Sequence, residues 1–182
     1  ASHFADPGEF RKTQNWIGGT KPNNASFVPP TVDDMHRALN DLEKFLHKKK
    51  IVPPLIHVAL AHAQFETIHP FLDGNGRIGR LLITLYLVDK EILKKPILYL
   101  SDFFERNRRD YYDNLTEVRT HNDIKKWVVF FLNGIIETSR KGVETFDSLL
   151  KLRDTIELQE LVKLGRKQED ARKLINQLYK SP

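Results

Sequence analysis

Apolar residues recur along much of the chain at the spacing of amphipathic helices. Residues 31–50 gather apolar side chains on one helical face, with Thr31 placed to cap the helix and Asp34 in its first turn. Residues 54–69 are apolar nearly all round, which predicts a central, buried helix. The face of residues 31–50 consists of Met35, Leu39, Leu42, Phe45 and Leu46.

The same spacing predicts helices through the rest of the chain. A second buried helix begins near Arg77, a further segment starts at Ser101 or Asp102, and Asn122 is expected to cap the next helix. From Lys141 onward the chain is strongly charged but keeps helical spacing. We therefore expect an all-α domain over residues 1–140 and a helical C-terminal extension over residues 141–182. The core face after Asn122 is Ile124, Trp127 or Val128, Phe131 and Ile135.

Residues 14–29 break the helical pattern. Two short segments, 14–18 and 25–29, have the composition of strands, and the stretch GTKPNN between them favours a turn. This arrangement predicts a single β-hairpin ahead of the helices.

Composition narrows the class of protein only modestly. The 182 residues are 40% apolar and 29% charged, which is typical of one soluble globular domain. The net charge of +5 permits acidic partners such as nucleotides. The chain contains no cysteine, which fits a cytoplasmic protein, and it has no signal-peptide pattern and no apolar run of membrane-spanning length.

The stretch HPFLDGNGRIGR, from His69 to Arg80, concentrates the candidate chemistry. Its two glycines next to Asp and Asn favour a turn that leads into a helix. Backbone N–H groups at such a helix start point outward and bind anions. Arg77 and Arg80 are three residues apart, so both fall in the first turn, where their guanidinium groups suit phosphate.

Asp73 and His69 complete a site for phosphoryl or nucleotidyl transfer. A carboxylate beside phosphate requires a bridging cation, and Mg²⁺ typically takes one or two carboxylates plus phosphate oxygens. Pro70 ends the preceding helix, so His69 lies at the rim of the phosphate site, where a neutral imidazole can accept a proton from a hydroxyl. Any one of these residues alone is more often a helix cap or a surface charge; their combination favours the phosphate site.

A zinc site is excluded on spacing. His57 and His62 precede His69 on the same helix, but no two of these histidines are four residues apart, as a zinc-binding pair on a helix requires. We expect His57 and His62 to be ordinary helix residues.

The stretch also resembles the signature of a known family. It matches the Fic-domain pattern H-P-F-x-[D/E]-G-N-G-R-x-x-R at all nine specified positions. The segments PGEFRKTQNWIGG, ASFVPP, LSDFFERNRRDYYDNLTEVR and WVVFFLNGI resemble other parts of bacterial Fic proteins, so the resemblance runs from about Pro7 to Ile136. It implies an all-α Fic fold, a helical bundle around the loop and its helix with one β-hairpin flap.

The resemblance implies a protein adenylyltransferase, which transfers AMP from ATP to a Ser, Thr or Tyr hydroxyl of a target protein. His69 would be the general base, and Asp73 would hold Mg²⁺ between the α- and β-phosphates. The anion hole would be Gly74, Asn75 and Gly76, and the phosphate clamps Arg77 and Arg80. Phe71 would anchor the loop in the core without taking part in the chemistry.

Two further sets of residues follow from the resemblance. Tyr111 and Tyr112 correspond to the lining of the nucleoside pocket, although one core and one surface tyrosine is an equally good interpretation. The hairpin corresponds to a flap that holds an extended target segment by strand addition. Its target-binding residues would be Ile17, Gly18, Gly19, Ser26 and Phe27.

Many Fic proteins carry an inhibitory helix with the pattern [S/T]-x-x-x-E-[G/N], whose glutamate pairs with the second arginine of the signature. No glutamate in this chain is followed by Gly or Asn, so the pattern is missing. In similar proteins that helix precedes such a start, and a winged-helix module follows such an end. We therefore expect a fragment of a longer protein, with nucleic-acid binding only through a C-terminal module outside these residues.

Other functions remain open at this point. Within the family these are another nucleotide donor, removal of AMP, or phosphorylation, the last disfavoured because kinase-like relatives lack the G-N-G of the loop. Outside it, the chain could serve as a nucleotide-sensing regulator associated with transcription. A third alternative, a peptide-binding module without catalysis, is disfavoured by the intact His69.

Overall fold

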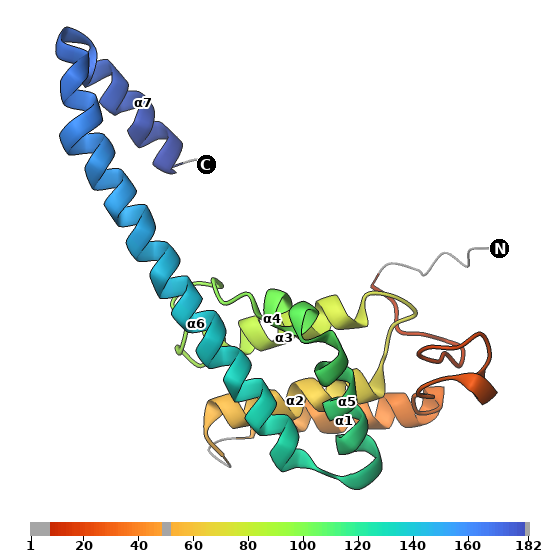
Figure 1. The fold of residues 1–182 in the computed structure, drawn as a ribbon. Helices are drawn as coiled ribbons and strands as arrows, with labels where there is room; N and C mark the ends of the chain where they lie inside the picture. Colours follow the sequence, from red (N-terminus) through yellow and green to blue (C-terminus); the bar gives the residue numbers. More distant parts are fainter. Residues whose placement is uncertain (1–7, 49–51, 181–182) are drawn as a thin grey trace. The chain divides into compact units, whose positions relative to one another are not determined.

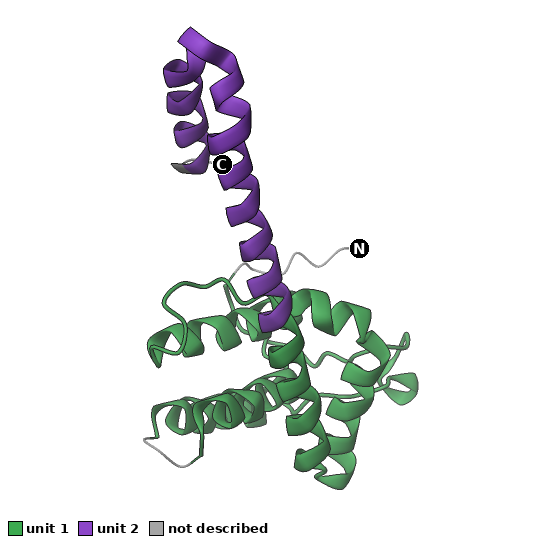
Figure 2. Cartoon of the chain, turned by 60° about the vertical axis from the view of Figure 1, so that its left-hand side comes forward, with its two compact units in different colours: residues 1–138 green, residues 139–182 purple. Residues whose placement is uncertain are grey.

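The computed structural model describes residues 8–48 and 52–180, which fold into helices joined by short connections. They form two compact units, residues 1–138 and 139–182, shown in green and purple in Figure 2. The first unit contains a 3₁₀ turn, η1, five helices and the first part of a sixth (Figure 1). Their bounds are η1 Pro22–Asn24, α1 Val32–His47, α2 Pro54–Ile68, α3 Asn75–Asp89, α4 Leu100–Arg106, α5 Arg108–His121 and α6 Ile124–Thr155.

Helix α1 confirms its predicted cap. The Thr31 side chain accepts a hydrogen bond from the Asp34 N–H, which satisfies one of the free amides of the first turn. Met35 and Leu42 are buried, as the apolar face predicts. The predicted end of this helix at Lys50 lies outside the described residues.

Helix α2 is the central element, and it packs against α1, α3 and α5. Pro54 occupies its first turn, where the missing N–H costs nothing. The helix ends at Ile68 because Pro70 cannot continue it. Its buried apolar residues contribute to two hydrophobic clusters. One cluster lies toward α1 around Met35, and the other lies toward α6 around Trp127 and Phe131.

Two helix boundaries differ from the prediction. Asn107 interrupts the expected continuous segment because its side-chain amide donates to the Phe103 carbonyl at 2.9 Å and ends α4. The prediction that Asn122 caps α6 is wrong. Asn122 ends α5 in the left-handed conformation, which asparagine tolerates, and Asp123 accepts the hydrogen bond from the Lys126 N–H at 3.0 Å instead.

The predicted hairpin is reduced to a single antiparallel bridge between Ile17 and Phe27, and no strand forms within the described residues. The next bridge outward would pair Asn15 with Pro29, which has no N–H to donate. The Gln14 side chain bonds the Pro29 carbonyl at 2.8 Å in place of a backbone ladder. The expectation of two strands is therefore wrong at the level of hydrogen bonding, although the chain does reverse direction there.

The second unit is a helical hairpin. It continues α6 through η2 Ile156–Glu160 and η3 Leu161–Lys167 into α7 Gln168–Lys180. Gly165 takes a left-handed φ of 53° at the bend, and Leu161 is buried. Within the part of the chain that the structure describes, no helix is both long and apolar enough to cross a membrane.

Candidate active site

The site is built on the connection between α2 and α3, where His69 adopts an unusual backbone conformation. Its φ of 49° and ψ of 61° are left-handed, which costs a non-glycine residue on the order of 1–3 kcal/mol. The conformation turns the chain away from α2 directly before Pro70. The imidazole is thereby fixed to the terminus of a buried helix.

Asn75 braces the loop that follows. Its side chain is buried, accepts from the Phe71 N–H at 2.9 Å and donates to the Phe71 carbonyl at 2.7 Å. These two bonds hold the amide group against the loop backbone, so we expect the predicted contribution of Asn75 to an anion hole to come from its backbone N–H. Phe71 packs against the cluster around Met35, as expected for an anchor.

Helix α3 begins two residues earlier than predicted, at Asn75, with Gly74 as its N-cap. Gly74 has a φ of 85°, which favours glycine, and its N–H bonds the Asp73 carboxylate at 2.7 Å. The first amides of α3 have no partner within the helix and carry the positive end of its dipole. Such a helix start has the geometry that can accept an anion.

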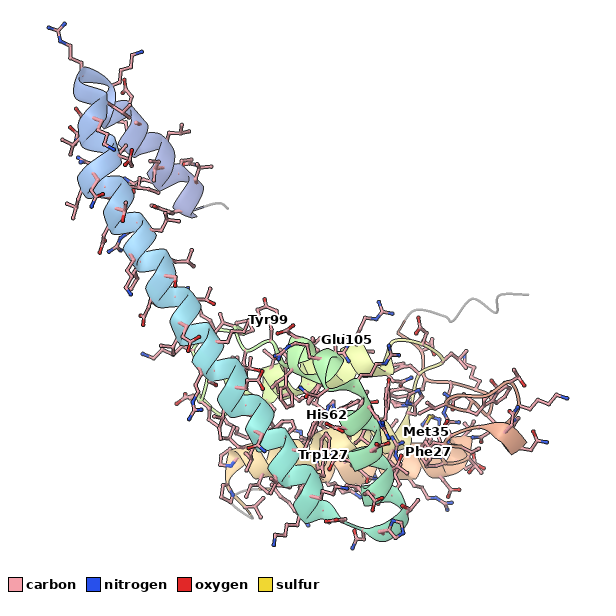
Figure 3. The ribbon with its side chains drawn as sticks, in the orientation of Figure 1. Phe27, Met35, His62, Tyr99, Glu105 and Trp127 are labelled. Carbon is pink, nitrogen blue, oxygen red and sulfur yellow. The ribbon has the colours of Figure 1, made fainter. Side chains whose placement is uncertain are left out.

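A cavity of about 340 Å³ opens over this helix start. Residues 69–80 supply most of its wall, and α4 and α5 supply the rest, including Glu105, which is labelled on α4 in Figure 3. The structure thus brings together His69, Asp73, the glycines and both arginines. The lining residues are His69, Leu72, Asp73, Gly74, Asn75, Gly76, Arg77, Arg80, Glu105, Arg108 and Tyr112.

The charged residues of the cavity include the carboxylate of Asp73, beside the two arginines predicted to bind phosphate. The Asp73 carboxylate is exposed and lies 3.4 Å from the Arg77 guanidinium. A Cβ at Gly76 would come within 3.2 Å of the Arg80 guanidinium. Because glycine has no side chain, the guanidinium can lie against the helix at this position. Across the described residues no cluster of three His, Cys, Asp or Glu could hold a metal by itself. One exposed carboxylate beside an anion cradle fits Mg²⁺, which takes its other ligands from phosphate and water.

His69 is electrostatically suited to be a base. Its pKa is lowered from 6.5 to about 4, mainly by burial and also by the positive charges of Arg119 and Arg11, while a hydrogen bond with the Glu66 backbone opposes the shift. The imidazole is therefore neutral at physiological pH. A neutral imidazole has a free lone pair, which proton abstraction requires.

Glu66, one turn before His69, is a buried carboxyl. Burial raises its pKa from 4.5 to about 7, opposed by the charges of Arg119 and Arg80. Its Oε1 has no hydrogen-bond partner among the described residues. A Cβ at Gly79 would lie 2.5 Å from that oxygen, so Gly79 provides the space that the carboxyl occupies.

The two tyrosines predicted to line the nucleoside pocket lie in different environments. Tyr112 lines the cavity, and the Arg108 guanidinium lies 5.9 Å from its ring centroid. Tyr111 is buried and does not line the cavity; its hydroxyl bonds His62 Nε2 at 3.0 Å. His62 Nδ1 faces the Gly79 carbonyl at 2.9 Å, so Nδ1 carries the proton and Nε2 accepts from Tyr111. His62 and Trp127 stack in the interior (Figure 3).

The predicted target-binding residues lie together in the hairpin. The Ile17 N–H donates to the Phe27 carbonyl at 2.8 Å, and both Phe27 and Ser26 donate to the Ile17 carbonyl. Gly18 and Gly19 have φ values of 70° and 67°, and a Cβ at Gly19 would collide with the Asn24 carbonyl. The turn is therefore tight and depends on both glycines.

Sequence reasoning did not single out four residues of this region. Glu105 and Arg108 line the cavity and pair at 3.4 Å. Arg11 and Arg119 lie behind His69. Arg108 precedes Tyr112 by one helical turn and Glu105 precedes it by two, so the turn spacing that leads to Tyr112 could have identified them.

Comparisons with known proteins agree on one family. Residues 1–87 match the sequence model of the Fic/DOC family. Over 125 residues, 68% of this chain and 22% of the relative, the chain is 34% identical to a protein named "Protein adenylyltransferase Fic" from Aedes aegypti. A protein of the same name from Nematostella vectensis is 31% identical over 71% of this chain and 27% of its own length. The chain thus spans about a quarter of these curated relatives.

Solved structures show the same fold. A Fic family protein from Desulfovibrio desulfuricans superposes with a TM-score of 0.65 at 29% identity, over 76% of this chain and 41% of that protein. A Fic domain containing signaling protein from Bacteroides thetaiotaomicron gives a TM-score of 0.60 at 22% identity, over 75% of this chain and 54% of that protein.

Proposed function

The chain is a Fic domain protein, and we propose that it transfers AMP from ATP to a hydroxyl side chain of a target protein. The observation that supports this best is the cavity itself, where a neutral His69, an exposed Asp73 carboxylate and two arginines surround a helix N-terminus. The names of the curated relatives point to the same reaction.

The proposed reaction is a displacement at the α-phosphorus of ATP. His69 accepts the proton of the target hydroxyl as the hydroxyl oxygen forms a bond to that phosphorus. The bond from the α-phosphorus to the bridging oxygen breaks, and pyrophosphate leaves. The products are an AMP ester of the target, pyrophosphate and a proton held by His69.

The other cavity residues bind and orient the nucleotide. The backbone amides at Gly74–Gly76 receive phosphate oxygens, and Arg77 and Arg80 neutralise the β- and γ-phosphates. Asp73 would hold Mg²⁺, which supplies positive charge to the departing pyrophosphate. Tyr112 offers its ring to the adenine base, and Tyr111 supports the Tyr112 ring by an edge contact with 5.3 Å between ring centroids.

The hairpin is proposed to present the target. Backbone hydrogen bonding along one extended segment would register a hydroxyl toward His69 with little demand on target sequence. The single bridge at Ile17 and Phe27 supports this, because it leaves most of the hairpin backbone outside a ladder within the chain.

The test is label transfer from ATP by the purified chain, to itself and to proteins of a lysate, with Mg²⁺ or with a chelator. Label on the α-phosphate should appear on protein, and label on the γ-phosphate should not. His69→Ala should abolish transfer, whereas His121→Ala, an exposed histidine on α5, should not. Transfer of γ-label would indicate phosphorylation instead, and a preference for GTP or UTP would indicate another donor. Full activity of His69→Ala would refute the mechanism.

A further inference from the structure

Two arginines that do not line the cavity converge on the end of α2. Arg11 is 1% exposed, and Arg119 of α5 is partly buried. Among the described residues no carboxylate oxygen lies within 4.0 Å of either guanidinium, although the charge of Glu66 acts on Arg119. Burying a guanidinium costs free energy unless its N–H groups find acceptors, so the question is which acceptors they have.

Arg11 donates to three backbone carbonyls. Its Nε bonds the His69 carbonyl at 3.1 Å, one Nη bonds the Thr13 carbonyl at 3.3 Å, and the other bonds the Pro30 carbonyl. Its own N–H donates to the Pro70 carbonyl at 2.8 Å. Thr13 and Pro30 are the two ends of the hairpin segment. One side chain therefore ties both ends of the hairpin to the backbone of His69.

Arg119 makes a parallel connection from the other side. It donates to the Glu66 carbonyl at 3.0 Å and to the Thr67 hydroxyl at 3.3 Å. Its guanidinium also lies 4.0 Å from the ring centroid of Phe27, the hairpin residue bridged to Ile17. Arg119 therefore joins the last turn of α2 to the second arm of the hairpin.

Each arginine donates to a carbonyl at the end of α2, which explains its position. The last carbonyls of a helix have no partner within it, and positive charge is favourable there. Glu66 and His69 contribute such carbonyls, and the fork of a guanidinium can hold two elements at once. A lysine has the charge but not the planar fork, so it could satisfy one of these connections and not all of them.

We propose that Arg11 and Arg119 are positioning residues, which hold His69 and the hairpin in one register so that a bound target hydroxyl meets the imidazole. This inference rests on the proposed transfer reaction. Neither residue touches ATP in this scheme, because neither lines the cavity. The two charges also face the imidazole and help to keep it neutral.

The experiment compares Arg11→Lys and Arg119→Lys with the parent chain, and uses Arg109→Lys, an exposed arginine of α5, as the matched control. Two quantities are measured on each: the affinity for a non-hydrolysable ATP analogue by calorimetry, and the rate of self-modification from α-labelled ATP at saturation. We expect unchanged affinity and a transfer rate lower by about 10- to 100-fold, the scale of a misplacement of about 1 Å. The control should match the parent in both.

Each result decides the proposal. A full transfer rate in both lysine variants overturns it, and so does a parallel loss of ATP affinity, which would show a general structural role. Should the lysine variants fail to fold, Thr67→Val removes the hydroxyl that accepts from Arg119 at a position outside both the hairpin and the cavity lining: a lower rate with unchanged affinity supports the proposal, and an unchanged rate overturns it. A parent chain that transfers no label at all refutes the proposed function instead, so the two failures are distinguishable.

Discussion

Replacing Glu66 with glutamine should stabilise the protein above neutral pH and remove much of its pH dependence. The carboxyl is 6% exposed, one of its oxygens has no partner among the described residues, and its pKa is raised from 4.5 to about 7. Glutamine has nearly the same shape and no charge. It therefore keeps the packing against Gly79 and avoids the cost of burying a carboxylate.

The difference between the folded and unfolded pKa of Glu66 sets the size of the stability change. Between these two pKa values the folded state holds a proton that the unfolded chain has released, so stability falls as the pH rises through that window. Each unit of pKa corresponds to about 1.4 kcal/mol, so the shift from 4.5 to about 7 amounts to a loss of about 3 kcal/mol above pH 7. Below pH 4.5 the ionisation contributes nothing. The variant lacks this loss entirely.

Urea unfolding of parent and variant at a series of pH values measures the effect. His62 and His69 have pKa values lowered to about 4, so both chains also lose stability as the pH falls from 6.5 toward 4. The histidine contribution is common to both chains, and the difference between the two curves isolates Glu66. That difference should grow with pH and level off above 7. Two parallel curves would refute the assignment of a desolvated carboxyl at this position.

Three further results are expected. Gly79→Ala should lower the free energy of unfolding by about 1–3 kcal/mol, as measured in urea, because the new methyl group would lie 2.5 Å from Glu66 Oε1; no change would show that the carboxyl moves freely. Asp73→Asn should weaken the gain in ATP affinity that Mg²⁺ provides, as measured by calorimetry with and without the metal, whereas the exposed Asp110→Asn should not. The transfer rate should not fall through protonation of His69 until the pH approaches its pKa of about 4, because burial and the charges of Arg11 and Arg119 outweigh the Glu66 carbonyl; a rate that halves near pH 6.5 would contradict this.

Local signals in the sequence were sufficient to predict much of the fold. Thr31 and Pro54 mark helix starts because capping and a missing N–H act within one turn. The cavity wall could be anticipated for a similar reason, since residues 69–80 are contiguous and their spacing alone places the glycines before the arginines. The resemblance to the Fic family then supplied expectations for roles that spacing cannot give, such as that of Tyr112.

What the sequence did not reveal depends on distant partners. Tyr111 and Tyr112 are adjacent, and only the packing of His62 decides which of them is buried. Arg11 looks like any surface arginine in a polar segment, because its acceptors at Pro30 and His69 are 19 and 58 residues away. The prediction of two strands in the hairpin was wrong because the turn, and not strand propensity, sets the register. That register places Pro29 opposite Asn15.

Most of the cavity wall comes from the contiguous residues 69–80, so its anion cradle and the register of the hairpin should differ in local stability. The anion cradle between His69 and Arg80 closes a loop of few residues, so little chain entropy is lost in forming it. The register between His69 and the hairpin depends on the contact from Arg11 across 58 residues and is lost when distant segments separate. Partial opening of the hairpin would thus release the target side while the nucleotide side persists. For the proposed transferase, ATP binding should then persist under conditions in which modification of a target is already lost.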